Sequence, residues 1–248
     1  MKRLKDKIAI ITGAGMGLGE SIAILFASEG AKVIIADINK NAGEETVARI
    51  KEFGGEAIFV LADVQKEIDA EMITHVATEQ FGRLDILVNN VGVQVNKTVI
   101  ETTEKEWDYV LNTNLKSMFF CSKYAIPQMV NTGGGNIICV SSLSGLVGNS
   151  KQASYNVSKH GVIGLTRCMA IDHASDNIRV NAICPGSMNT PLTQSIPQEK
   201  LEPYYNLNVQ KRFAKPIEVA RAVLFLASDE ASFVTGSVMV ADAGYTTM

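Results

Sequence analysis

Short apolar runs alternate with longer amphipathic runs along the chain. The apolar runs are rich in β-branched residues and span residues 7–12, 32–37, 57–63, 84–90, 136–142, 178–186 and 237–244. Most are apolar at every position, which is typical of parallel strands covered on both faces. Runs with helical periodicity lie between them, at residues 17–28, 42–53, 67–81, 104–131, 152–174 and 217–227. This alternation predicts an α/β Rossmann fold, a doubly wound seven-stranded parallel sheet with helices on both faces.

The 248 residues are expected to form a single domain, because no repeat, low-complexity tract or Pro/Gly-rich linker divides the sequence. Residues 186–215 depart from the alternation, being polar with scattered prolines. Long excursions in compact domains are often lids or binding loops. We therefore expect a substrate loop at about 186–215, with a surface insertion of no function as the alternative.

Composition narrows the possible partners. Hydrophobic residues make up 46% of the chain and charged residues 20%, as in globular proteins with a large core. The formal net charge of −3, without a basic block, argues against nucleic acid. No run approaches the roughly 20 apolar residues of a membrane span, and no signal-peptide cleavage site follows the first apolar run. The four separated cysteines and three histidines show no metal-ligand spacing. We expect a cytoplasmic protein that binds no metal, membrane or nucleic acid.

A glycine-rich turn, TGAGMGLG at 12–19, follows the first predicted strand. Ligands of open α/β sheets bind at the carboxyl ends of the strands, where this turn lies. Gly13 permits a tight turn, while Gly17 and Gly19 let a pyrophosphate and the next helix approach closely. The amide groups and dipole of that helix favour an anion. The turn alone has little specificity for dinucleotides.

Asp37 adds specificity to the glycine turn. It ends the second predicted strand, 18 positions after Gly19, where an acidic residue reaches the adenosine ribose hydroxyls. Its carboxylate would repel a 2′-phosphate, and the glycine turn holds no basic residue. NAD is therefore the predicted cofactor, with NADP less favoured. A helix N-cap or a solvated turn is the alternative role for Asp37.

In combination, these features resemble the classical short-chain dehydrogenases/reductases, whose glycine pattern is T-G-x-x-x-G-x-G. The likeness continues to the end of the chain. The further matching stretches are Asp63-Val64, NNVG at 89–92, LNTNL around Asn114, VSS ending at Ser142, YNVSK with Tyr155 and Lys159, NAICPG followed by Thr190, and ADAG at 241–244. Val91, Met188 and Ala243 depart from the usual family residues, which affects details of the cofactor groove rather than the reaction.

The resemblance implies a catalytic tetrad of Asn114, Ser142, Tyr155 and Lys159. It also implies cofactor contacts from Thr12, Gly13, Gly17, Leu18, Gly19, Asp37, Ile38, Asp63, Val64, Asn90, Val91, Gly92, Tyr155, Lys159, Pro185, Gly186, Met188 and Thr190. In the family, the asparagine holds a water molecule that connects the lysine to solvent. Members are usually tetramers, so a homotetramer is expected.

The residues themselves support this chemistry. Tyr155 and Lys159 are four apart in a predicted helix and share a face, so the ammonium is expected to lower the phenol pKa toward the working range of a general acid or base. Ser142 could position and polarise the substrate oxygen. Ser141 competes with it, but the thirteen-residue spacing to the tyrosine in the family selects Ser142. Asn112 competes in the same way with Asn114.

The predicted function is NAD-dependent hydride transfer between the cofactor and a secondary alcohol or ketone. Polar residues suit a sugar or another polyhydroxy substrate, and the expected substrate contacts are Ser142, Ser144, Gln94, Asn149, Gln152 and Tyr155. One alternative is an NADPH-dependent enzyme like the 3-oxoacyl-[acyl-carrier-protein] reductases. A remote alternative is a non-catalytic nucleotide-binding sensor.

Overall fold

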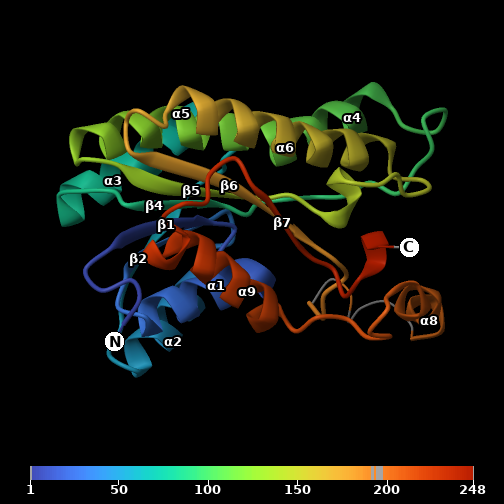
Figure 1. Cartoon of the computed structure of the whole chain (residues 1–248), viewed down its shortest axis with the longest axis horizontal. Coiled ribbons are helices and arrows are strands. Elements are labelled where there is room, and N and C mark those ends of the chain that lie inside the picture. Colours follow the sequence, from blue (N-terminus) through green and yellow to red (C-terminus); the bar gives the residue numbers. More distant parts are fainter. Residues whose placement is uncertain (1, 191–192, 194–197, 248) are drawn as a thin grey trace.

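The computed structural model describes residues 2–190, 193 and 198–247, and shows one parallel sheet between two layers of helices (Figure 1). The sheet has seven strands in the order β3-β2-β1-β4-β5-β6-β7. Their bounds are β1 Ile8–Thr12, β2 Lys32–Asp37, β3 Glu56–Leu61, β4 Ile86–Asn89, β5 Gly135–Val140, β6 Ile178–Pro185 and β7 Val238–Ala241. Strand order reverses between β1 and β4, the switch point where ligands of such sheets bind. The predicted doubly wound fold is confirmed.

Each face of the sheet is covered by its own helices (Figure 1). One layer contains α1 (Gly17–Ser28), α2 (Lys40–Glu52) and α9 (Pro216–Ala227), and the other contains α3 (Glu67–Phe81), α4 (Glu104–Leu111), α5 (Ser117–Asn131) and α6 (Ala153–Asp172). Two apolar clusters fill the two interfaces, one around Phe26 of α1 and one around Met118 of α5. Because strand side chains alternate between the faces, apolar runs such as Ile8–Ile11 serve both clusters.

The segment predicted as one helix over residues 104–131 contains a π-helical turn at Asn112–Lys116, between α4 and α5. Two hydroxyls bond to backbone carbonyls around this turn: Thr113 Oγ1 donates to Tyr109 O at 2.7 Å, and Ser117 Oγ donates to Thr113 O at 2.5 Å. Single π turns inside α-helices are frequent at functional sites. This one carries Asn114, which is fully buried.

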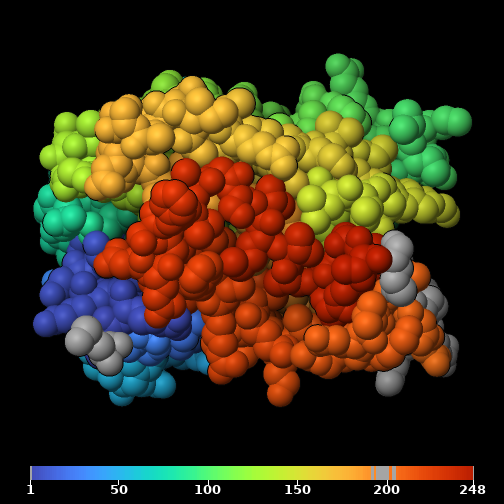
Figure 2. Space-filling model, viewed as in Figure 1, coloured from blue at the N-terminus to red at the C-terminus, as the bar shows by residue number. Residues whose placement is uncertain are grey.

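The excursion at 186–215 is more regular than its sequence indicates. Residues 191–192 and 194–197 lie outside the described residues, but α8 occupies Gln198–Leu207. Its inner side is anchored by apolar packing: Leu201 and Phe213 are buried, and the Tyr205 and Phe213 ring centroids are 4.3 Å apart. Figure 2 shows the C-terminal segment, in red, against the orange segment around α8. The Gln210 amide donates to Ala243 O at 3.3 Å there.

The cysteines are free, and three of them, Cys121, Cys139 and Cys184, are buried. Burial raises the pKa of the Cys121 thiol to about 12, so this side chain packs as an apolar group. Over the described ranges, no group of three or more His, Cys, Asp or Glu side chains is placed to hold a metal ion. In the same part of the chain, no helix has the length and apolar character needed to cross a membrane.

Candidate active site

The glycine turn requires glycine for two reasons, a positive φ at some positions and a close backbone approach at another. Gly13 and Gly17 have φ values of +63° and +62°, a region that residues with a side chain rarely adopt. A Cβ atom on Gly19 would lie 2.1 Å from Gly13 O, so α1 could not pack this close to the turn. Asn90 holds the turn from β4, because its Nδ2 donates to Thr12 O at 3.0 Å and to Gly13 O at 3.1 Å.

Asp37 connects the glycine turn to the start of α2. Its Oδ2 accepts the Gly15 amide at 2.8 Å, and its Oδ1 accepts the Asn39 amide at 2.9 Å. The N-cap of α2 is Asn39, whose side chain accepts from the Ala42 amide. A carboxylate offers about four acceptor positions, and two are used by these bonds to described residues; Asp37 also lines the adjoining cavity. Asp37 thus combines a structural role with a place at that cavity.

A cavity of about 420 Å³ lies along the carboxyl edge of β1, β2 and β4, and we call it the cofactor cavity. Ile38 and Met16 line this cavity and are 71% and 50% exposed. They leave apolar surface against which a flat ring could pack. Predicted cofactor contacts among its lining residues are Gly13, Asp37, Ile38, Asp63, Val64, Asn90, Val91 and Gly92. The lining residues that were not predicted are Met16, Ala36, Asn39, Ala62, Gln65, Val93, Tyr109 and Thr113.

Other predicted cofactor contacts are not among the lining residues of this cavity. Thr12 faces β4, because its hydroxyl donates to Val88 O at 3.3 Å and accepts the Asn90 amide at 3.0 Å. Leu18 lies on α1 and is buried in the apolar cluster around Phe26. Pro185 is the last residue of β6. A Cβ atom on Gly17 would lie 3.7 Å from Thr190 Cγ2, so the glycine turn and the segment after β6 are adjacent.

Tyr155 and Lys159 extend from α6 on one face, as their spacing predicts. Lys159 Nζ lies over the Tyr155 ring, 5.7 Å from its centroid, and donates to Val140 O at 2.9 Å. A Cβ atom on Gly92, which lines the cofactor cavity, would lie 3.2 Å from this Nζ, so a larger residue at this position would crowd the lysine head. Lys159 is 2% exposed and has no carboxylate partner among the described residues.

The pKa values of this pair differ from the sequence expectation. Burial raises the pKa of Tyr155, and a hydrogen bond with Ser142 acts in the opposite direction. Burial also lowers the pKa of Lys159 to about 8. The expected lowering of the phenol pKa by the ammonium is therefore absent from the free protein, because Lys159 lies over the ring face and its own charge is desolvated.

Ser142 and Ser141 have different surroundings. Ser142 Oγ accepts the Ser144 amide at 3.1 Å, so its own hydrogen can be donated elsewhere. Ser141 Oγ donates to Lys159 O at 2.8 Å and joins β5 to α6. Of the two, Ser142 lines the cavity that contains Tyr155. The geometry therefore favours Ser142 over its competitor.

Asn114 joins the π turn to the loop after β4 and to α6. Its Oδ1 accepts the Val93 amide at 2.7 Å, and its Nδ2 donates to Val93 O at 2.8 Å and to Ser158 Oγ at 3.0 Å. These bonds hold the strand end beside the residue that precedes Lys159. Asn112 instead lines an outer groove with Phe119, so Asn114 is the better placed of the two competitors.

A second cavity at this edge, of about 250 Å³, is called the substrate cavity here. It brings together the predicted substrate contacts with several predicted cofactor contacts. Its lining residues that were predicted singly are Gln94, Ser142, Ser144, Asn149, Gln152, Tyr155, Gly186, Met188 and Thr190. Ser187 and Thr193 come from the predicted substrate loop, and Leu143 and Tyr245 were not predicted. Tyr245 directly follows the ADAG stretch at 241–244, for which the resemblance implied no contact in the site.

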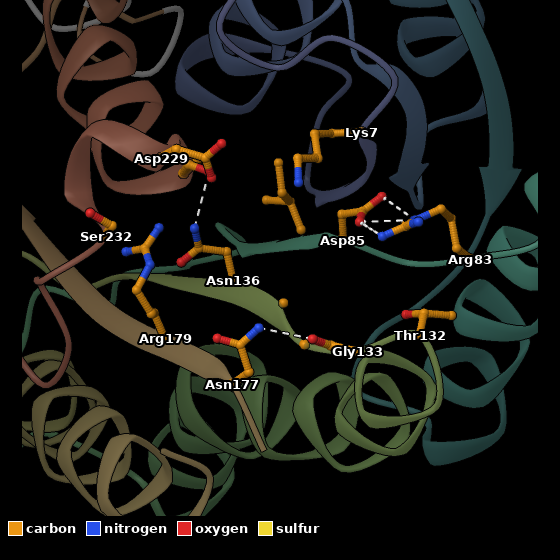
Figure 3. A pocket seen from close by; sticks show the side chains of 14 residues that line it. Lys7, Arg83, Asp85, Thr132, Gly133, Asn136, Asn177, Arg179, Asp229 and Ser232 are labelled. Atoms are coloured by element: carbon orange, nitrogen blue, oxygen red, sulfur yellow. Dashed lines mark hydrogen bonds and ion pairs between the residues drawn. The ribbon is translucent and has the colours of Figure 1, made fainter. Parts of the chain in front are cut away.

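A third cavity, of about 240 Å³, lies at the amino ends of the strands (Figure 3). Its side chains include Lys7, Arg83, Asp85, Asn136 and Arg179. Arg83 Nη2 donates to Asp85 Oδ1 at 2.5 Å (Figure 3). Asp85 Oδ2 also accepts the Ile8 amide at 2.9 Å. Arg179 donates to three backbone carbonyls at and beyond the end of α9, those of Leu226, Ser228 and Val234. These contacts hold strand starts and helix ends together.

Comparison with known proteins identifies the family. The family model described as Enoyl-(Acyl carrier protein) reductase matches residues 13–246. The chain is 41% identical to a cyclopentanol dehydrogenase of Comamonas sp. over 99% of both sequences, and 39% identical to the 3-oxoacyl-[acyl-carrier-protein] reductase FabG of Thermotoga maritima over 98% of both. A crystal structure of a putative short-chain dehydrogenase/reductase from Burkholderia xenovorans superposes with a TM-score of 0.96 at 35% identity, covering 100% and 99% of the two chains.

The sheet, the glycine turn and the Tyr155–Lys159 pair define a Rossmann-fold oxidoreductase. The chain belongs to the classical short-chain dehydrogenases/reductases, a family of nicotinamide-dependent oxidoreductases.

Proposed function

We propose that this protein transfers hydride between a nicotinamide cofactor and the carbinol or carbonyl carbon of a small secondary alcohol or ketone. The observation that carries the proposal is the placement of Ser142 and Tyr155 in one cavity, with Lys159 over the Tyr155 ring and the cofactor cavity beside them. The relation to a cyclopentanol dehydrogenase supports an alcohol or ketone as substrate. The polar lining supports a sugar or another polyhydroxy compound within that class.

The residues of the chain would handle the proton and the substrate oxygen. Ser142, whose oxygen accepts the Ser144 amide, donates its hydrogen to the substrate oxygen and holds it beside Tyr155 Oη. Tyr155 gives a proton to that oxygen in reduction and takes one from it in oxidation. Because burial raises its pKa, Tyr155 is protonated at neutral pH in the free protein and ready for reduction.

Lys159 and Asn114 would support this proton transfer. Lys159 lies over the Tyr155 ring and does not lower the phenol pKa in the free protein, but its ammonium would offset the phenolate charge once bound cofactor and substrate bring the two groups into play. Asn114 holds the strand end beside the lysine and is proposed to hold the water through which the proton reaches solvent. When bound, the nicotinamide supplies the hydride or accepts it.

The residues present fit a dinucleotide. Gly13 and Gly17 leave backbone open at the turn, and Gly19 lets the N-terminus of α1 lie against it. The apolar Ile38 and Met16 flank the end of the cavity that Asp37 also lines. We propose NAD as the cofactor, because the Asp37 carboxylate at this cavity would repel the 2′-phosphate of NADP. Lys40, a nearby base that could attract a 2′-phosphate, is paired with Glu44 at 3.8 Å.

A second candidate is NADPH-dependent reduction of a 3-oxoacyl thioester, which the relation to FabG favours. The test is oxidation of secondary alcohols, sugars and β-hydroxyacyl thioesters with NAD⁺ and NADP⁺. Turnover of an alcohol or sugar with NAD⁺ supports the proposal. Turnover of only the thioester, with NADP⁺, overturns both the substrate class and the role of Asp37.

We also infer that the protein forms a homotetramer, as its family membership suggests. An apolar groove lies on the outer side of the helix layer that contains α3, α4, α5 and α6. Its lining includes Leu115, Phe119 and Leu165, and it supports self-association there. Phe119 and Val157 are each about half exposed on this side. Light scattering coupled to size-exclusion chromatography tests the mass, and a monomer at micromolar concentration contradicts the inference.

A further inference from the structure

The C-terminal segment is folded so that Tyr245 is fixed at the substrate cavity. Asp242, which is buried, organises the turn. Its Oδ1 accepts the Gly244 amide at 3.0 Å, and its Oδ2 accepts the Thr246 amide at 2.8 Å and the Thr246 hydroxyl at 2.7 Å. Gly244 has a φ of +82°, which favours glycine. The segment therefore carries Tyr245 on a defined backbone.

Tyr245 begins a chain of hydrogen bonds along one side of the cavity. Tyr245 Oη donates to Asn149 Oδ1 at 3.1 Å, and Asn149 Nδ2 donates to Ser144 Oγ at 2.8 Å. Ser144 Oγ in turn donates to Gln152 Oε1 at 3.3 Å. Amide oxygens only accept, so every hydrogen in the chain points from Tyr245 toward Gln152. We call Tyr245, Asn149, Ser144 and Gln152 the polar wall.

The polar wall has unused hydrogen-bonding groups at both ends. Within the described residues, Gln152 Nε2 makes no hydrogen bond, so its two N–H groups are free donors at the cavity. Tyr245 Oη donates its hydrogen to Asn149 but accepts none in the same part of the chain, so its lone pairs are free. The backbone of Gln152 is held by a β-bridge to Lys97, which fixes the donor end.

The polar wall lies close to the position of the reacting oxygen. The Ser144 amide donates to Ser142 Oγ at 3.1 Å. The amide nitrogen and hydroxyl oxygen of one serine are three covalent bonds apart, so the two Oγ atoms lie within about 7 Å of each other. A substrate that bonds to Ser142 and to the polar wall therefore needs its second oxygen close to the first, on a neighbouring carbon or on a carbon one further away.

We propose that the polar wall binds a second oxygen of the substrate, carried one or two carbons from the reacting carbon. The enzyme would then select small vicinal or 1,3-dioxygenated alcohols, and the matching hydroxyketones, over monohydric alcohols of the same size. The second oxygen is bound and not transformed. A substrate that lacks it leaves the free groups of Gln152 and Tyr245 unpaired in a small cavity, which sites built for a hydroxyl discriminate against strongly. This inference rests on the proposed function.

The test compares two alcohols that share a ring: cyclopentanol and 1,2-cyclopentanediol, the latter as cis and trans isomers. The purified protein is assayed with NAD⁺ and with NADP⁺. We expect kcat/KM for the better diol isomer to exceed that for cyclopentanol at least about 10-fold. Equal or higher kcat/KM for cyclopentanol overturns the inference and leaves the proposed function intact. Failure to oxidise any alcohol with either cofactor contradicts the proposed function instead.

Variants locate the preference in the polar wall. Tyr245→Phe removes one hydroxyl, and Gln152→Met removes the amide at similar length. Each is expected to lower the diol-to-monohydric ratio of kcat/KM about 10-fold, mainly through a higher KM for the diol. Tyr124→Phe is the control, because the Tyr124 hydroxyl donates to Glu67 on the surface of α3 and α5. Ratios that stay at the wild-type value in both wall variants, with unchanged Tm, overturn the proposal.

Discussion

The two edges of the sheet use buried charge in opposite ways. At the amino edge, Asp85 is 5% exposed, and its carboxylate accepts from Arg83 and from the Ile8 amide. At the carboxyl edge, Lys159 is 2% exposed and donates to a neutral carbonyl, that of Val140. The first charge is paired with an opposite charge, whereas the second has none among the described residues. A buried charge is costly unless it is paired, so the two residues should affect stability with opposite signs.

This difference shows where the fold favours function over stability. The amino edge has a cavity of comparable size to the substrate cavity, but three of its charged side chains, Arg83, Asp85 and Arg179, join strands and helix ends (Figure 3). The carboxyl edge keeps hydroxyls, amides and an ammonium with hydrogen-bonding capacity left for ligands. Cavity size therefore does not separate the two edges, whereas the surroundings of their buried charged groups do.

The largest expected effect is catalytic and falls on the carboxyl edge. Tyr155→Phe removes the proposed proton carrier and keeps the ring over which Lys159 lies. We expect kcat to fall about 1,000-fold or more, within the range for loss of a general acid or base. The Kd for NADH, measured by fluorescence titration, should change less than about 3-fold, because the other residues at the cofactor cavity are unchanged.

The outcome of this substitution also addresses the sensor alternative. A non-catalytic nucleotide-binding protein would keep its function in the Tyr155→Phe variant. Tyr124→Phe on the far side of the second helix layer serves as the matched control and should retain wild-type kcat. Equal kcat values for the wild type, Tyr155→Phe and Tyr124→Phe would show that Tyr155 does not carry the proton.

The next effect is on stability and falls on the amino edge. Asp85→Ala leaves the buried Ile8 amide without its acceptor and removes the Arg83 pair. Loss of a charge-assisted hydrogen bond of this kind should lower the free energy of unfolding by about 2–3 kcal/mol. Denaturant unfolding at one fixed protein concentration measures it. Asp229→Ala, an exposed aspartate at the same cavity, should change stability by less than about 0.5 kcal/mol.

The kinetic constants should separate the two edges further. Asp85→Ala is expected to leave kcat and KM at wild-type values at temperatures where the variant stays folded, because Asp85 lies at the far end of the strands. A large fall in kcat in the folded variant would contradict the division of roles between the edges.

The sequence predicted the carboxyl edge better than the amino edge. The glycine turn, Asp37, Ser142 and the Tyr155–Lys159 pair could be found because each motif has a local spacing tied to a strand or helix end. Asp85 gave no such signal, since its partner Ile8 is 77 positions away and the contact exists only after β1 and β4 pair. Tyr245 was missed for a related reason: its place depends on the turn around Asp242 and on packing beside α8.

Two local features also lay beyond sequence patterns. The π turn at Asn112–Lys116 has the same apolar periodicity as the helices that flank it, so periodicity predicted one unbroken helix. The direction of the Tyr155 pKa shift depends on burial and on the position of the Lys159 head over the ring, neither of which the four-residue spacing defines. Spacing brings the two side chains together, but three-dimensional packing sets their charge.

The smallest expected effect has the opposite sign to that of Asp85→Ala. Lys159→Met removes a buried, unpaired ammonium and keeps an apolar stem of similar length. We expect the free energy of unfolding at pH 7 to rise by about 1–2 kcal/mol, since loss of the bond to Val140 O offsets part of the relieved desolvation. Activity should be lost in the same variant, as in other cases where active-site groups cost stability.

The pH dependence of this gain follows from the Lys159 pKa of about 8, which is below the ordinary value of 10.5. Between these two values the unfolded chain binds a proton that the folded chain does not, so wild-type stability rises with pH there. The advantage of Lys159→Met should therefore be largest below pH 8 and shrink as pH increases toward 10.5. Denaturant unfolding of both proteins without cofactor at pH 7, 8, 9 and 10 measures this difference. A variant that is less stable than wild type at pH 7 would show that the lysine stabilises the fold, and the contrast with Asp85 would not hold.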